Sequence, residues 1–275
     1  VNQIKWCEMK FDFFETGTGP ALLFLPGSFS THAAWRAVQN ELNGQYRMIT
    51  TSLPGYGGTP EIRSDKTNNM ELVTDFVAEV VARIEEPVHL IGHSYGGMNA
   101  YAATLCGKVN PKSIVTFEGN PIFSKHPAKP FAWTQSVRNT MRAFEEAVIT
   151  GNANAAGIVI DFWSHSGMFQ SMPPQVADYC RSKVQTNLWD WRHASSFTPE
   201  FSAYERLDMP CTVVRGELCN QAMRDVSDEI VANAQSAVLH IEPNAGHFLI
   251  STHPKACATV IDGHMRLYEA NFSNF

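Results

Sequence analysis

Residues 88–105, VHLIGHSYGGMNAYAATL, place a short polar stretch between two apolar runs. The first run is typical of a buried β-strand, and the second is typical of a helix that packs against a core. Between them, Gly92, Ser94 and Gly96 fit the pattern G-x-S-x-G, in which a sharp strand-to-helix turn exposes a nucleophilic serine. Small residues two positions on either side keep such a turn free of collisions. The stretch predicts Ser94 as a nucleophile, and the alternative is a tightly packed turn in which Ser94 only caps a helix.

Short apolar runs alternate with helical patterns along much of the chain. An opening hairpin is predicted within residues 4–17, and longer helices are predicted at residues 70–85 and 255–270. Strands are predicted at residues 21–26, 47–53, 88–93, 113–119, 211–216 and 237–242. Strands that are apolar on both faces and separated by helices indicate the α/β class, with a mostly parallel central sheet flanked by helices.

The alternation stops between residues 120 and 205, where no convincing strand occurs. The composition becomes aromatic there, and helices are predicted at residues 135–150 and 175–188. We therefore expect an inserted helical cap at residues 120–205, and a core domain formed by residues 1–119 and 206–275.

Composition and charge exclude several classes of function. The 275 residues are 44% hydrophobic, and 21 Lys and Arg stand against 27 Asp and Glu without a run of like charge. This balance argues against a nucleic-acid or membrane-surface partner and favours a small-molecule substrate. No apolar run is long enough to span a membrane, and we expect a cytoplasmic protein with six reduced cysteines. No cofactor or metal site is predicted, and the sequence leaves a homodimer open.

Three further segments resemble the α/β-hydrolase fold family, in the same order along nearly the full chain. LFLPGSFSTHAAW, residues 23–35, resembles the family's oxyanion loop, with Pro26 where a histidine is usual. SLPGYGGT, residues 52–59, resembles the glycine-containing loop after the next strand, and PNAGHF, residues 243–248, resembles the loop that carries the catalytic histidine. The resemblance implies the α/β-hydrolase fold with a helical cap.

The resemblance also implies roles for individual residues. His247 follows the last predicted strand, at the sheet edge where parallel sheets bind ligands, and it would be the general base for Ser94. The backbone N–H groups of Ser28 and Tyr95 would form the oxyanion hole. His93, next to the serine, is expected to pack beneath it.

The third catalytic residue departs from the family pattern. The position where the family usually has an aspartate is occupied by Cys219, and a thiol cannot stabilise an imidazolium as a carboxylate does. Glu118, Glu217 and Asp225 are the available replacements. Glu118 is favoured because it ends the strand after the nucleophile strand, although it could instead cap the inserted segment or pair with an arginine.

The predicted reaction is acyl transfer through Ser94, with cleavage of an ester, a thioester or a carbon–carbon bond next to a ketone. Substrate contacts are predicted for Phe29, Phe123, Trp163 and His165. Other candidates for an apolar pocket are Trp133, Phe162, Met168, Phe169 and Trp189. Two alternatives stay open: a lyase or cofactor-free oxygenase in which the serine only positions substrate, and a ligand-binding module without turnover.

Overall fold

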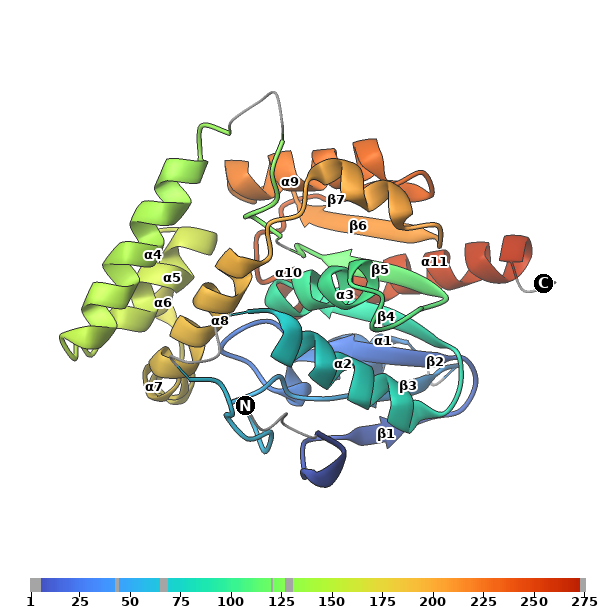
Figure 1. The fold of residues 1–275 in the computed structure, drawn as a ribbon, viewed down its shortest axis with the longest axis horizontal. Helices are drawn as coiled ribbons and strands as arrows, with labels where there is room; N and C mark the ends of the chain where they lie inside the picture. The colour runs from blue at the N-terminus through green and yellow to red at the C-terminus, as the bar shows by residue number, and fades with distance from the viewer. Residues whose placement is uncertain (1–5, 43–44, 65–68, 120, 127–130, 273–275) are drawn as a thin grey trace.

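The sheet of this protein has seven strands and is parallel except at one edge (Figure 1). The computed structural model describes residues 6–42, 45–64, 69–119, 121–126 and 131–272. The strands are β1 (Phe14–Thr16), β2 (Ala21–Leu25), β3 (Arg47–Thr50), β4 (Val88–His93), β5 (Ser113–Phe117), β6 (Cys211–Gly216) and β7 (Ala237–Glu242). They lie in the order β1-β3-β2-β4-β5-β6-β7, and only β1 runs antiparallel to its neighbour β3. The predicted fold class is thereby confirmed.

The opening hairpin is the one wrong strand prediction. Its first two residues lie outside the described part of the chain, and Trp6–Glu8 forms a 3₁₀ turn, η1, instead of a strand. Trp6 is buried, and its ring contacts those of Phe11 and Phe76. Because this aromatic contact holds the segment against a helix, β1 is left to pair with β3.

Helices cover both faces of the sheet, as the doubly apolar strands predict. In β2, Leu22 and Phe24 pack on one side with α1 (Arg36–Glu41) and α11 (Pro254–Phe272). Leu23 and Leu25 pack on the other side with α2 (Glu71–Ile84), α3 (Tyr95–Leu105) and α9 (Gln221–Asn233). Two short elements, η2 (His32–Trp35) and α10 (Leu249–Thr252), lie next to α1. The two cores fix the sheet, so the loops at its carboxyl edge are held in place.

Among the described residues between β5 and β6, five helices stand at one end of the sheet (Figure 1). They are α4 (Thr134–Ile149), α5 (Ala155–Trp163), α6 (Met168–Ser171), α7 (Pro174–Ser182) and α8 (Val184–Ser196), and η3 (Phe201–Arg206) follows them. The helical prediction at residues 175–188 is confirmed, except that a turn at Lys183 divides the stretch between α7 and α8. The Nζ of Lys183 donates to the carbonyl oxygen of Gly55, 2.8 Å away, which ties this joint to a core loop.

A buried hydrogen-bonded chain crosses the sheet near the amino-terminal ends of β4, β5 and β6. Ser113 Oγ lies 2.7 Å from both His89 Nδ1 and His264 Nε2, and His264 Nδ1 lies 2.8 Å from Thr212 Oγ1. Two neutral rings satisfy this chain, with each hydroxyl donating to one imidazole nitrogen. Burial lowers the pKa of each histidine to about 4, and for His89 the charges of His264 and Lys112 add to the effect. Both rings are therefore neutral at pH 7.

The free energy of unfolding is expected to fall as the pH drops from 7 to 5. In the unfolded chain these histidines bind protons near pH 6.5, whereas in the folded protein they do so only near pH 4. The unfolded state thus binds more protons in this window. The stabilisation is complete above pH 6.5 and is lost toward pH 4, at up to about 1.4 kcal/mol per pH unit for each histidine. Urea unfolding at a series of pH values measures this slope.

A matched pair of variants assigns that slope to the buried chain. His264→Gln removes one titrating ring and should flatten the pH dependence by about one proton between pH 5 and 6.5. His165→Gln makes the same side-chain change at an exposed position outside this chain of hydrogen bonds and serves as the control. If His264→Gln folds and keeps the wild-type slope, the buried chain does not set the acid stability.

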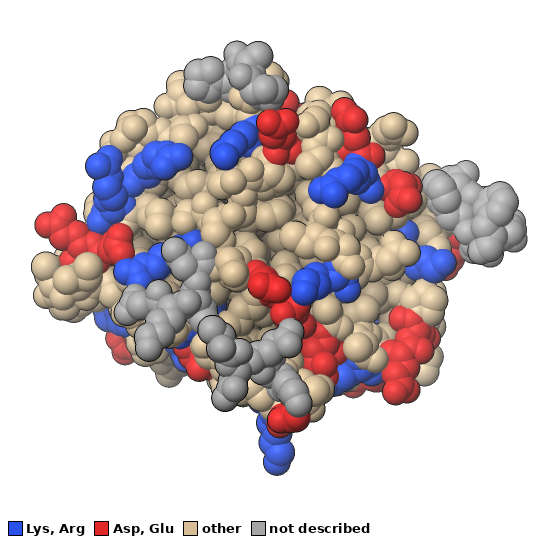
Figure 2. Space-filling model, in the orientation of Figure 1, with Lys and Arg blue, Asp and Glu red and all other residues tan. Residues whose placement is uncertain are grey.

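On the face shown in Figure 2, acidic and basic side chains are intermingled. Within the described residues, none of the helices combines the length and the apolar character that crossing a membrane requires.

Candidate active site

Ser94 lies on the tight turn between β4 and α3, in a backbone conformation with φ 51° and ψ −122°. This conformation leaves no room for larger neighbours. A Cβ on Gly96 would lie 2.3 Å from the carbonyl oxygen of Leu25, and one on Gly92 would lie 2.5 Å from the Cα of Gly97. The glycines of the pattern are therefore required by close backbone packing, and the strained turn directs the serine hydroxyl away from the sheet.

Three loops at the carboxyl edge of the sheet bring Ser94, His247 and Glu118 together. Ser94 follows β4, Glu118 follows β5, and His247 lies on the loop after β7. His247 Nε2 is 3.0 Å from Ser94 Oγ, and His247 Nδ1 is 2.7 Å from Glu118 Oε2. The carboxylate accepts from Nδ1–H, so Nε2 carries the lone pair that accepts the serine proton. All three side chains are buried.

Glu118 is held by hydrogen bonds with β6, one through its backbone and one through its side chain. Its backbone has φ 48°, and its N–H donates to the carbonyl oxygen of Val214, 2.7 Å away. Its second carboxylate oxygen, Oε1, accepts from the N–H of Gly216 at 2.9 Å. Burying a carboxylate is unfavourable unless it is paired, and here both oxygens have a donor. The side chain thus has one orientation, with Oε2 directed at the imidazole.

The two competing carboxylates have other partners. Glu217 is exposed, and its Oε2 accepts from the N–H of Asn244 at 2.9 Å. Asp225 accepts from Trp133 Nε1 at 2.9 Å and from Gln221 Nε2 at 2.6 Å. Only Glu118 of the three candidates contacts His247 among the described interactions.

Cys219, at the position where the family pattern has an aspartate, is a buried thiol. Burial, with the nearby charge of Glu118 as a smaller cause, raises its pKa to about 11. The thiol therefore stays neutral beside the carboxylate.

His93 is fixed beneath the loop that carries His247. Its Nε2 lies 2.8 Å from the carbonyl oxygen of His247 and donates to it. Burial lowers the pKa of His93 to about 3, with the charge of His247 as a smaller cause. His93 is thus neutral and holds the backbone of the loop.

The loop after β2 approaches the nucleophile closely. A Cβ on Gly27 would lie 2.9 Å from His93 Nδ1 and 3.1 Å from Ser94 Cβ, so a larger residue would push the loop away. Ser28 and Tyr95 line the same cavity as Ser94. Tyr95 is the first residue of α3, and its N–H therefore has no acceptor within the helix. In the loop after β2, Phe29 directly follows Ser28 and has φ 57°. This backbone conformation costs roughly 1–2 kcal/mol for a residue with a side chain.

A mainly apolar cavity of about 350 Å³ is lined by Ser94 and His247, and Glu118 lies behind His247. Of the predicted substrate-contacting residues, Phe29 and Trp163 line it, and the Trp163 ring stacks on that of His247 with centroids 5.6 Å apart. Further apolar side chains come mostly from α5, α7 and α8 and the loops around them. They include Met98, Ile122, Val159, Ile160, Met172, Val176, Trp191, Ala194 and Phe248.

Two of the residues predicted to contact substrate lie outside the described lining of this cavity. His165 lies in the exposed turn between α5 and α6, where its Nδ1 is 3.1 Å from the carbonyl oxygen of Ser166. Phe123 lines a different surface hollow, together with Phe131 and Arg138. Of the wider aromatic set, Trp133, Phe162, Met168, Phe169 and Trp189 are likewise absent from the described lining of the cavity. The composition of the segment indicated a cavity without showing which residues face it.

Trp163→Ala is expected to shift the preference toward longer acyl chains. The change removes an indole from the cavity wall, and each added methylene that finds room is worth about 1 kcal/mol or more. The ratio of kcat/KM for p-nitrophenyl octanoate to that for the butyrate should rise about 10-fold.

The matched control is Trp189→Ala, which truncates a buried tryptophan of α8 that is not part of the cavity lining. Its ratio should equal that of the wild type. A ratio that moves equally in both variants would show that general loosening, and not the cavity wall, sets the preference.

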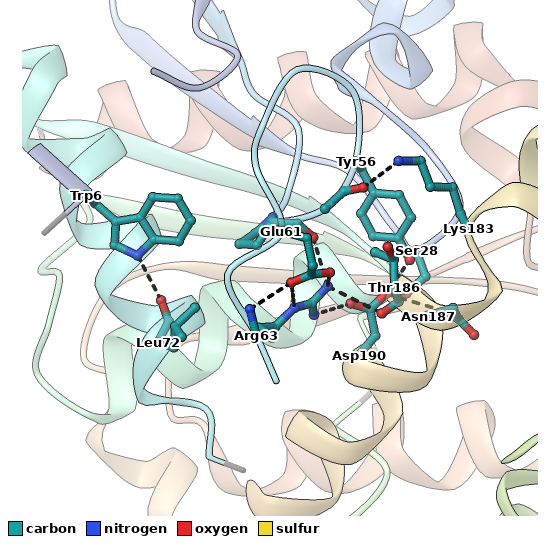
Figure 3. A network of polar contacts seen from close by, with 12 residues as sticks. Trp6, Ser28, Tyr56, Glu61, Arg63, Leu72, Lys183, Thr186, Asn187 and Asp190 are labelled. Carbon is teal, nitrogen blue, oxygen red and sulfur yellow. Dashed lines mark hydrogen bonds and ion pairs between the residues drawn. The ribbon is translucent and has the colours of Figure 1, made fainter. Parts of the chain in front are cut away.

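Sequence reasoning missed a polar cluster at the cavity. Asp190 on α8 is buried and accepts from Ser28 Oγ and from the Tyr56 hydroxyl, each at 2.6 Å, and it pairs with Arg63 (Figure 3). The partners lie up to 162 positions apart in the sequence. One feature of the sequence could have indicated this cluster: Asp190 stands between two tryptophans, in a helix that otherwise buries apolar side chains.

The arrangement has the parts of a hydrolase that forms a covalent intermediate: a strained serine, a base, a carboxylate behind the base and a loop close to the nucleophile. Residues 22–260 match the alpha/beta hydrolase family, and the chain belongs to that family. The resemblance predicted from the sequence is thereby confirmed.

Curated relatives include esterases. A pimeloyl-acyl-carrier protein methyl ester esterase from Aeromonas salmonicida is 24% identical over 265 residues, which cover 89% of this chain and 95% of that protein. A protein of the same name from Aeromonas hydrophila is 32% identical over 108 residues, which cover 39% of this chain and 41% of the relative.

Solved structures show the same fold at low sequence identity. MenH from S. aureus is 15% identical with a TM-score of 0.75, and the match covers 94% of this chain and 98% of that one. A bromoperoxidase from Bacillus anthracis is 16% identical with a TM-score of 0.76, covering 92% and 94%. At these identities the likeness concerns the fold alone.

Proposed function

We propose that this chain hydrolyses carboxylic esters through an acyl intermediate on Ser94. The observation that carries the proposal is the continuous hydrogen-bonded sequence from Ser94 through His247 to Glu118, buried beneath a cavity large enough for a small substrate. Curated relatives named as methyl ester esterases support an ester as the bond that is cleaved. The same arrangement argues against a serine that only positions substrate, because its hydroxyl already contacts a base.

The proposed mechanism has two steps. His247 Nε2 takes the Ser94 proton while Oγ bonds to the ester carbonyl carbon, whose oxygen becomes an alkoxide. The N–H groups of Ser28 and Tyr95 stabilise this oxyanion, and Glu118 stabilises the imidazolium. His247 then returns its proton to the leaving alcohol as the carbon–oxygen bond breaks. Water repeats the attack on the acyl enzyme and releases the acid.

The cavity favours an ester with a small to medium apolar group. Its lining is mostly apolar, so burying methylene groups there gains roughly 0.8 kcal/mol each. We also propose that residues 120–205 act as a cap, because the apolar side chains of α5, α7 and α8 form much of this lining. Water would then be excluded from one wall of the reaction site.

The experiment is hydrolysis of p-nitrophenyl esters from acetate to decanoate by the purified chain. The proposal predicts turnover with a kcat/KM that rises with chain length and then falls, when the acyl group no longer fits the cavity. Ser94→Ala protein prepared in parallel measures the background. Wild-type rates that do not exceed this background for any chain length would reject the proposal.

A further inference from the structure

A buried carboxylate on the inserted helices contacts the loop that would hold the oxyanion. Asp190 lies on α8 among buried tryptophans, and one of its oxygens, Oδ2, accepts from the hydroxyls of Ser28 and Tyr56 at 2.6 Å each. Its other oxygen, Oδ1, accepts from Arg63 Nη1 (Figure 3). One side chain of the inserted helices thus joins the loop after β2 to the loop after β3.

Arg63 keeps the aspartate in place. The guanidinium is fully buried, and it also donates to both carboxylate oxygens of Glu61 and to the carbonyl oxygen of Pro54. Burial raises the pKa of Asp190, whereas Arg63 and the two hydroxyl donors oppose that rise. The guanidinium supplies the countercharge that a buried carboxylate needs, and further donors are the hydroxyls of Ser28 and Tyr56 and, at 3.4 Å, the side-chain amide of Asn187.

The loop that receives this contact is strained. Phe29, directly after Ser28, has φ 57°, and such a conformation persists only where neighbouring contacts fix the backbone. Ser30 Oγ donates to the carbonyl oxygen of Gly27 at 2.6 Å, which closes the loop on its far side. The bond from Ser28 Oγ to Asp190 fixes the loop to the inserted helices, and the backbone N–H of Phe29 donates to the hydroxyl of Tyr56, which itself donates to Asp190.

We infer that Asp190 is a positioning residue, which through Ser28 Oγ holds the backbone N–H of Ser28 where the oxyanion forms. The inference rests on the proposed function, and adds that the inserted helices help to assemble the oxyanion hole. An oxyanion donor must lie about 2.7–3.1 Å from the oxygen, so a loop that relaxes by a fraction of an ångström weakens this bond in the transition state. Ser28 and Asp190 also line the cavity, but the bond between them acts on the oxyanion donor, so we expect a larger effect on kcat than on KM.

Ser28→Ala is the first test, because it removes Oγ and leaves the backbone N–H in place. We expect kcat to fall about 10–100-fold, KM to change less than about threefold, and the melting temperature to stay close to that of the wild type. A purely structural role for the contact would lower the melting temperature and leave kcat per folded molecule unchanged.

Asp190→Asn is the second test. Arg63 presents only donors, so the amide oxygen must face it and the NH₂ group must face Ser28. The charge-assisted bond from Ser28 is thereby lost while the shape is kept. We expect the same 10–100-fold fall in kcat, and the double variant Ser28→Ala/Asp190→Asn should be no worse than about twofold below the slower single variant. Glu145→Gln is the control. Glu145 lies on α4 and pairs with Arg192, which is on α8 like Asp190, so the change breaks an ion pair of α8 without touching the loop after β2.

Inhibition by a trifluoromethyl ketone separates positioning from stability. Ser94 Oγ adds to its carbonyl carbon, the serine proton passes to His247, and the carbonyl oxygen becomes an oxyanion. Its Ki should rise in both variants by the same factor as kcat/KM falls, whereas the Ki of the matching methyl ketone, which binds as a ground-state analogue, should not change.

The outcomes of this experiment are distinct. If the wild type hydrolyses esters, but folded Ser28→Ala keeps its kcat and its trifluoromethyl ketone Ki, the inference about Asp190 is wrong and the proposed function stands. If the wild type neither hydrolyses esters nor binds the trifluoromethyl ketone more tightly than the methyl ketone, the proposed function fails and the inference fails with it.

Discussion

Replacing Ser94 with alanine is expected to lower kcat by about 10⁴–10⁶-fold. The change keeps Cβ, and therefore the packing of the turn, but removes the atom that bonds to the substrate. His247 and Glu118 then have no hydroxyl to activate. The residual rate comes from water that attacks the ester directly, while the oxyanion donors stabilise the charge on the carbonyl oxygen. Steady-state hydrolysis of a p-nitrophenyl ester measures the loss, and near-UV circular dichroism shows that the fold is retained. A variant that keeps more than a tenth of the wild-type kcat would remove Ser94 from the mechanism.

Glu118→Gln is expected to lower kcat by about 10³–10⁴-fold. Two donors face this side chain, His247 Nδ1–H on one oxygen and the N–H of Gly216 on the other. A carboxylate accepts both, but an amide has one oxygen and one NH₂ group, so it must present NH₂ to one of these donors. If NH₂ faces His247, the ring takes the tautomer with its proton on Nε2 and cannot accept the proton of Ser94.

Glu217→Gln is the matched control, with the same chemical change two positions before Cys219. Its carboxylate is exposed and accepts from the backbone of Asn244, so kcat should stay within about twofold of the wild type. Equal losses in the two variants, or a larger loss in Glu217→Gln, would mean that Glu118 is not the carboxylate that orients His247. Melting temperatures of both variants separate catalysis from stability.

The sequence predicted the sheet and the turn well, because both depend on local pattern. Strands such as β4 and β6 are short apolar runs between turn residues, and the glycines around Ser94 are required by backbone contacts within a few ångströms. Strand order then determines which loops meet. Glu118 could be favoured but not assigned from the sequence, because all three candidates are carboxylates and only their partners in the fold tell them apart.

The inserted helices were predicted less well. Aromatic residues are frequent there, but which of them faces the cavity depends on how each helix is rotated, so Trp163 lines the cavity while Phe123 and His165 do not. Asp190 could not be found from local pattern, because its partners Ser28 and Arg63 come from loops more than a hundred positions away. Long-range polar contacts leave almost no local signal in one sequence.

The most direct test of the central claim is to find where a fluorophosphonate bonds to the protein. In the proposed reaction Ser94 Oγ displaces fluoride at phosphorus, and His247 accepts the serine proton. Peptide mapping by mass spectrometry should place one adduct on the peptide that contains Ser94, with no adduct in Ser94→Ala and much slower labelling in His247→Ala. An adduct on any other serine, or a folded wild-type protein that stays unlabelled, would contradict the account.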